Sequence, residues 1–179
     1  MNPKKIAITG GPGTGKTSII KGLEALDYLC YEEISRQVTL QAREDGIEQL
    51  FLAEPLLFSE KLLEGRVQQF NAASHEERKL VFLDRGIPDV LAYMDFIGDN
   101  YPEHFLAACK KHTYDAVFIL PPWETIFVSD AERYENFEQS KTINKHLIET
   151  YQNLDYNLKT VPFGTVKERI NFILENLSL

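Results

Sequence analysis

The chain has 179 residues, of which 44% are hydrophobic and 26% are charged, and its formal net charge is −8. The length predicts one domain over residues 1–179, and the acidic balance argues against default binding to nucleic acid or anionic membranes. Two cysteines are too few for a disulfide scaffold, no stretch resembles a signal peptide, and no apolar run approaches a membrane span of ~20 residues. We therefore expect a cytoplasmic protein, monomeric or dimeric, without a nucleic-acid or membrane partner.

Short apolar runs alternate with longer amphipathic segments along the chain, which is typical of an α/β fold with a parallel sheet. The pattern predicts three layers, with a five-stranded parallel sheet and helices on both faces. Strands are expected at residues 4–9, 28–31, 80–83, 116–120 and 158–161. Helices are expected at residues 16–26, 33–44, 55–70, 88–96, 102–112, 143–154 and 166–177.

A polar stretch at residues 129–139 lies between the fourth expected strand and the helix that follows it. Segments of this kind close over enzyme sites and exclude water during group transfer. We expect a lid at about residues 124–140.

The segment Gly10–Thr17 fits the pattern G-x-x-x-x-G-K-[ST] at every fixed position and lies between an expected strand and an expected helix. This context indicates a phosphate-binding loop (P-loop) rather than an ordinary glycine-rich turn. Its backbone N–H groups can point at phosphate oxygens, and the helix N-terminus adds the positive end of its dipole. The residues expected to contact the nucleotide are Gly11, Pro12, Gly13, Thr14, Gly15, Lys16, Thr17 and Ser18.

Within this loop, Lys16 would neutralise the β- and γ-phosphates, and the Thr17 hydroxyl would bind Mg²⁺. The ligand is therefore expected to be a nucleoside triphosphate, ATP or GTP, together with Mg²⁺.

Asp84 and Arg85 directly follow the clearest buried strand, at residues 80–83. Ligands of open parallel sheets bind at the carboxyl ends of strands, so this pair is expected beside the P-loop. Asp84 would serve the Mg²⁺ site. Arg85 stands where hydrolysing ATPases usually carry a glutamate, and arginine cannot accept a proton but can clamp an acceptor. The pair favours phosphoryl transfer over hydrolysis, with a structural salt bridge as the alternative.

Glu33 and Arg36 follow the second expected strand and share a face if a helix begins there. The Glu33 carboxylate would bind an acceptor hydroxyl or accept its proton, and Arg36 would bind a second phosphate. Whether Glu32, Glu33 or Asp84 acts as the base stays open. An acidic helix start with an internal ion pair is the alternative.

Asp130 and Arg133 are the candidate functional residues of the expected lid. On closure, Arg133 would neutralise charge on the transferring phosphoryl group, and Asp130 would orient it or contact the acceptor. A solvated charged turn is the alternative. Near the last strand, the backbone of residues 163–165 could support a base, and Trp123 could stack on a ring or simply pack. The histidines show no ligand spacing, so Mg²⁺ is the only metal implied.

Five motifs occur in order along the chain: the P-loop, Glu33-x-x-Arg36, Phe82-Leu83-Asp84-Arg85-Gly86, Asp130-x-x-Arg133 and the Val161-Pro162 strand end. This order resembles the small P-loop proteins related to the nicotinamide riboside kinase domain of NadR. That group also contains predicted ATPases described as AAA domains and a GTP-binding relative involved in photoreceptor trafficking. The resemblance spans nearly the whole chain and implies a nucleoside- or nucleotide-kinase type of fold. It also implies phosphate and Mg²⁺ binding at Lys16 and Thr17, a metal role for Asp84 and a lid role for Arg133.

Two functions are compatible with these residues. The first is a small-molecule kinase, in which ATP·Mg²⁺ binds the P-loop and Glu33 or Asp84 positions the hydroxyl of a nucleoside-like or other metabolite. Arg36 and Arg85 would anchor this acceptor. The second is a regulatory switch or NTPase, dependent on ATP or GTP, without a small acceptor. No guanine-specific N-K-x-D motif supports GTP, and the short length and Arg85 argue against an AAA+ machine.

Overall fold

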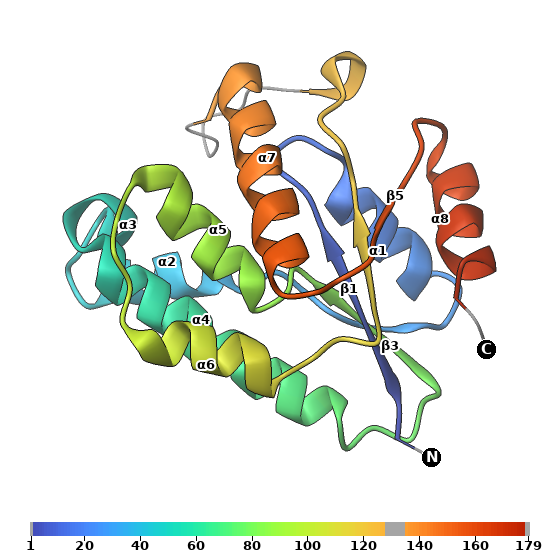
Figure 1. The fold of residues 1–179 in the computed structure, drawn as a ribbon, viewed down its shortest axis with the longest axis horizontal. Helices are drawn as coiled ribbons and strands as arrows, with labels where there is room; N and C mark the ends of the chain where they lie inside the picture. The colour runs from blue at the N-terminus through green and yellow to red at the C-terminus, as the bar shows by residue number, and fades with distance from the viewer. Residues whose placement is uncertain (1, 128–134, 178–179) are drawn as a thin grey trace.

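The computed structural model describes residues 2–127 and 135–177, which form a parallel sheet covered by helices on both faces (Figure 1). The sheet confirms the predicted three-layer α/β architecture. Its spatial order is β2-β3-β1-β4-β5, and every neighbouring pair is parallel. The strands are β1 (Lys4–Thr9), β2 (Leu29–Tyr31), β3 (Leu80–Asp84), β4 (Ala116–Ile119) and β5 (Leu158–Thr160). Because β1 is central, the P-loop that follows it lies at the middle of the sheet's carboxyl edge.

The helices largely follow the expected ranges. In chain order they are α1 (Lys16–Glu24), α2 (Ser35–Glu44), α3 (Leu50–Ala53), α4 (Pro55–Ala73), α5 (Pro88–Ile97), α6 (Glu103–Lys111), α7 (Phe137–Asn153) and α8 (Val166–Glu175), with a 3₁₀ turn, η1 (Glu124–Ile126), after β4. Figure 1 shows α1 and α8 on one side of the sheet and the α4–α7 group on the other.

Alternate residues of the central strands face opposite layers, because successive side chains of a strand point to opposite faces. In β1, Ile6 and Ile8 pack with α1 and α8, whereas Ala7 joins the core formed with α4, α5, α6 and α7. In β3, Phe82 faces the first of these cores and Leu83 the second. The central strands are therefore buried on both sides, and this is why they appear as continuous apolar runs in the sequence.

The structure differs from the sequence-based expectation in the helices around the lid and after the second strand. Helix α7 begins at Phe137, within the expected lid, because Asn136 and Gln139 form a reciprocal capping box at its first turn. The range 124–140 also includes the 3₁₀ turn η1 at its start. Helix α2 begins at Ser35, so Glu33 precedes the helix instead of lying on it.

Smaller differences concern α3 and α4. The short helix α3 is not predicted, and α4 continues beyond its expected end at residue 70 to Ala73, because Phe70 and Ala73 remain buried. Cys30 is partly exposed on the edge strand β2, and its partial burial raises the pKa of its thiol to about 12. No helix in the described ranges is long and apolar enough to cross a membrane.

Candidate functional site

The P-loop connects β1 to α1 in a conformation that depends on glycine. Gly10, Gly13 and Gly15 have φ angles of 147°, 72° and 88°, a region that residues with a Cβ atom rarely adopt. Gly15 is also the N-cap of α1. The Thr14 hydroxyl donates to the Gly11 carbonyl oxygen at 2.9 Å and closes the loop on itself. The loop therefore has the shape that turns backbone N–H groups toward an anion.

Lys16 is buried and folds back over the loop. Its Nζ donates to the carbonyl oxygens of Gly10 at 2.8 Å and Gly11 at 3.0 Å. Burial, and then the positive charge of Arg85, lower the pKa of Lys16 to about 7, while nearby carboxylates, Asp84 first among them, act in the opposite direction. An anionic phosphate at this position would favour the charged ammonium.

Asp84 ends β3 and is only 6% exposed. Its Oδ1 is buried without a hydrogen-bond partner among the described residues. Burial raises the pKa of Asp84, and Lys16 opposes that rise. Thr17 and Ser18 are exposed in the first turn of α1. An orphaned carboxylate oxygen at the end of β3 and an exposed hydroxyl at the start of α1 are oxygen donors of the type that a hard divalent cation such as Mg²⁺ prefers. The residues present therefore fit the implied ion.

Glu33 is held by two arginines. Its Oε2 forms an ion pair with Arg85 Nε, and its Oε1 lies 3.2 Å from Arg66 Nη2. Burial alone would raise the pKa of Glu33, but Arg85, Arg66 and Lys16 outweigh it and lower the pKa to about 2. Glu33 is thus an ionised carboxylate at neutral pH. The two arginines come from α4 and from the turn after β3, and both are far from Glu33 in the sequence.

Arg85 joins this carboxylate to the P-loop. Its Nη1 donates to the Gly10 carbonyl oxygen at 3.2 Å, the same oxygen that accepts from Lys16. The same nitrogen lies 3.3 Å from Asp89 Oδ1, and the guanidinium lies over the Tyr93 ring. The backbone of Arg85 has φ of +75°, a left-handed conformation that costs a residue with a Cβ about 1–2 kcal/mol. The structure therefore brings together the predicted residues Lys16, Glu33 and Arg85.

Three of the predicted site residues, Arg36, Asp130 and Arg133, stay predictions. Arg36 is exposed in the first turn of α2, and the ion pairs described for Glu33 are those with Arg66 and Arg85. Asp130 and Arg133 lie outside the described residues.

Sequence reasoning missed Arg66, Asp89 and Arg169. Arg66 interrupts the apolar stripe of α4 and donates to the Gly86 carbonyl oxygen at 3.1 Å. Asp89 follows Arg85 by four residues and is completely buried. The signal for both was a charged residue on an otherwise buried helical face, since such residues are almost never fully buried unless they are paired.

Arg169 ties the last helix to the P-loop. Both of its Nη atoms donate to the Thr14 carbonyl oxygen at 3.1 Å. Its guanidinium also lies over the Trp123 ring, 5.8 Å from the centroid, and Trp123 stacks on Phe163 at 4.9 Å. Trp123 and residue 163, at the start of the backbone segment named as a possible support for a base, therefore meet beside the P-loop.

The segment between β4 and α7 also contacts the P-loop at two points. Gly13 has no room for a Cβ atom, because the Phe127 ring lies against it. At the start of α7, Ser140 Oγ donates to the Pro12 carbonyl oxygen at 2.8 Å. Both described ends of the expected lid are therefore attached to the loop.

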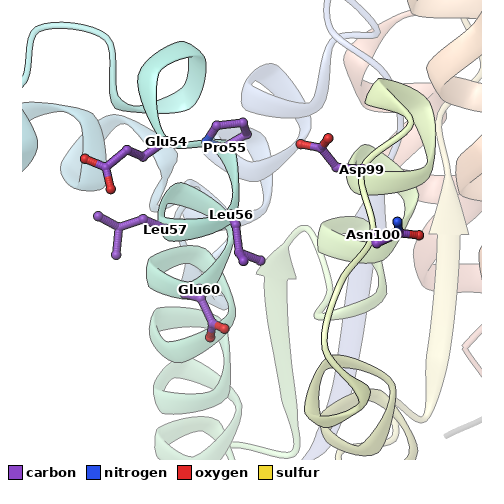
Figure 2. A pocket seen from close by; sticks show the side chains of 7 residues that line it. All are labelled: Glu54, Pro55, Leu56, Leu57, Glu60, Asp99 and Asn100. Atoms are coloured by element: carbon purple, nitrogen blue, oxygen red, sulfur yellow. The ribbon is translucent and has the colours of Figure 1, made fainter.

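A separate cavity of about 590 Å³ lies between the first turns of α4 and the Asp99–Asn100 turn after α5 (Figure 2). It is lined by Glu54, Pro55, Leu56, Leu57, Glu60, Asp99 and Asn100, and none of these is a candidate site residue. Among the described residues, no group of His, Cys, Asp and Glu is arranged to hold a metal ion on its own.

Comparisons with known proteins agree with this geometry. A family profile described as an AAA domain matches residues 5–169. Deoxyadenosine kinase from M. mycoides is 21% identical, with a TM-score of 0.67 over 96% of this chain and 97% of its own. Thymidylate kinase from Candida albicans is 17% identical, with a TM-score of 0.69 over 97% of this chain and 90% of its own.

The NadR protein in complex with NR is 14% identical, with a TM-score of 0.73. The match covers 99% of this chain and 51% of the NadR chain, so the present chain spans about half of that protein. No curated protein sequence is significantly similar. The structural likenesses show a P-loop, nucleotide-kinase-like fold.

Proposed function

The chain belongs to the AAA-domain family, and from that premise we propose that it transfers the γ-phosphoryl group of ATP to a hydroxyl of a small nucleoside-like metabolite. The observation that carries the proposal is the position of Glu33. Its carboxylate is held by Arg85, which shares the Gly10 carbonyl oxygen with Lys16 of the P-loop. A carboxylate thus lies one side chain away from the donor phosphate site, where an acceptor hydroxyl has to be oriented.

The transfer forms a bond between the acceptor oxygen and the γ-phosphorus and breaks the bond from that phosphorus to the β–γ bridging oxygen, which leaves ADP. Glu33, ionised at neutral pH, accepts the hydrogen bond of the hydroxyl, takes its proton late and returns it to water. A weak base suffices, because the transition state of phosphoryl transfer is loose and catalysis depends on positioning. We prefer Glu33 to Asp84 for this role, because the unpartnered Asp84 oxygen fits a cation better.

Mg²⁺, when bound with the nucleotide, neutralises charge on the β- and γ-phosphates. Thr17 and Asp84 would hold it. Lys16 binds the same phosphates through its ammonium, and the P-loop N–H groups orient them. Arg85 and Arg36 are the proposed acceptor contacts.

Asp130 and Arg133 would complete the site from the lid. The stacked Trp123 and Phe163 rings offer an apolar face to a nucleobase, and adenine and guanine both suit such a surface. The base preference is therefore set by contacts other than stacking.

The decisive experiment is transfer of labelled γ-phosphate from ATP or GTP to a panel of nucleosides, nucleotides and other metabolites. We expect one acceptor class to be labelled by the wild-type protein and by Lys21→Ala, which changes an exposed lysine on the same helix. Lys16→Ala should lose the transfer. If the protein binds nucleotide, labels no acceptor and changes its affinity for a partner protein with the nucleotide state, it is a switch and not a kinase.

A further inference from the structure

Asp89 is a fully buried carboxylate on α5 that the proposed transfer reaction does not itself use. Its Oδ2 accepts hydrogen bonds from the Gly86 N–H at 3.1 Å and the Tyr151 hydroxyl at 2.6 Å. Its Oδ1 accepts from the Thr9 hydroxyl at 2.6 Å and from Arg85 Nη1 at 3.3 Å. The partners come from β1, the turn after β3, and α7.

The two oxygens of Asp89 have different surroundings. Oδ2 contacts the Gly86 N–H, three residues earlier in the chain, and Tyr151 of α7, so it serves local structure. Oδ1 faces Thr9, the last residue before the P-loop, and Arg85, the residue that pairs with Glu33. Oδ1 therefore links the end of β1, which leads into the P-loop, to the arginine that pairs with Glu33.

Arg85 requires such a partner. An arginine side chain has about 2 kcal/mol of rotamer entropy, and the Arg85 backbone is in a left-handed conformation. The guanidinium is fixed at Nε by Glu33 and at Nη1 by Asp89 and the Gly10 carbonyl oxygen. If the Nη1 contact to Asp89 is lost, the Gly10 carbonyl oxygen is the remaining described hydrogen-bond partner of Nη1. Arg85 can then turn more easily about its ion pair with Glu33, and the carboxylate is held less firmly beside the P-loop.

We propose that Asp89 is a positioning residue that fixes Arg85, and through it Glu33, relative to the P-loop. The proposal that Asp89 affects catalysis rests on the proposed function. The proposal that it holds Arg85 is independent of any activity.

The test of positioning uses the Arg85 Nε–H resonance in a ¹H–¹⁵N spectrum of the full-length protein, assigned by its loss in Arg85→Lys. We expect Asp89→Asn to shift this resonance and speed its exchange with water. An asparagine amide must place its NH₂ against either Arg85 or the Gly86 N–H, and both of these are donors. Asp99→Asn, an exposed change of the same charge after α5, should leave the resonance unchanged. Tyr151→Phe, which removes a donor only from Oδ2, should keep the Arg85 contact.

A folded Asp89→Asn protein whose Arg85 resonance keeps its position and exchange rate overturns the proposal. If Asp89→Asn does not fold, the wild-type spectrum provides the test. A guanidinium held at Nη1 gives separate Nη resonances for Arg85. A single averaged Nη resonance overturns the proposal.

The catalytic consequence is measured with the acceptor that the labelling panel identifies. We expect Asp89→Asn to lower kcat by about 100-fold, as misplacement of a reacting group does, with little change in KM for ATP. Unchanged kcat in the folded variant would show that Asp89 is structural only. If no acceptor is labelled, the proposed function fails, whereas the resonance test still shows independently whether Asp89 holds Arg85.

Discussion

At the scale of single residues, the candidate site balances its buried charges locally. Arg85 lies between Glu33 and Asp89, and Arg66 forms a second ion pair with Glu33. Transfer of an unpaired charge from water to the interior is very costly, so removal of one partner leaves the other buried charge uncompensated. The network therefore links stability to the same groups that the proposed reaction uses.

The first prediction concerns Glu33 and pH. Burial raises the pKa of Glu33, but Arg85 and Arg66 outweigh burial and lower it to about 2. A carboxyl group whose pKa is lower in the folded protein stabilises the fold above its unfolded pKa, near 4.5, and loses that contribution as pH falls toward 2. We expect Glu33→Gln to lower the unfolding free energy by about 3 kcal/mol at pH 7, because Arg66 and Arg85 each lose an ion pair with Glu33.

Urea unfolding at pH 7, 4 and 3 measures this effect. The wild-type unfolding free energy should fall more steeply than that of Glu33→Gln over this range, so that the two curves converge. Parallel curves would mean that the ion pairs of Glu33 with Arg66 and Arg85 do not contribute to the pH dependence of the unfolding free energy.

At the scale of elements, the sequence predicted those features that follow from local pattern. The strands were recognisable because burial on both faces makes them continuous apolar runs. Helix α2 ends at Glu44 as expected, and Gly46, with φ of +88°, lies just beyond it. The start of α7 was missed because the Asn136–Gln139 capping box lies in a polar stretch that also resembles a loop. The partners of Glu33 could not be inferred, because spacing identified Arg36 whereas folding brings Arg66 and Arg85 to it.

The second prediction tests the contact between α8 and the P-loop. Arg169→Lys keeps the charge but can no longer donate from two Nη atoms to the Thr14 carbonyl oxygen. Loss of one such hydrogen bond is worth about 1.4 kcal/mol, so the affinity for ATP·Mg²⁺ should fall roughly tenfold by titration calorimetry. Arg78→Lys, in an exposed ion pair with Asp27, is the matched control and should bind normally. Equal affinities in both variants would show that α8 does not support the loop.

At the scale of the whole molecule, the single tryptophan of the chain reports on the nucleotide site. Trp123 lies between Phe163 and Arg169, and Arg169 contacts the P-loop. The third prediction is that ATP·Mg²⁺ changes the Trp123 emission, whereas tripolyphosphate, which has no base, does not. At 100 times its dissociation constant, ATP should add about 2.7 kcal/mol of stability and raise Tm by roughly 5–10 °C.

The same titration on Lys16→Ala controls for nucleotide that binds elsewhere, and its Tm should not rise. A rise in Tm for the wild-type protein without a change in emission would place the base away from Trp123 while leaving the P-loop assignment intact.

The contacts that complete the site also determine when it can form. Thr9 reaches Asp89 across 80 residues, Tyr151 reaches Asp89 across 62, and Arg169 reaches Thr14 across 155. Closing such long segments is slow, because their entropy is lost before the contacts compensate for it. During synthesis, the complete P-loop sequence leaves the ribosome before α7 and α8 do. At that stage neither Tyr151 nor Arg169 is available to hold Asp89 and the loop in place. We therefore expect nucleotide to stabilise the nascent protein only after α7 and α8 have been added to the fold.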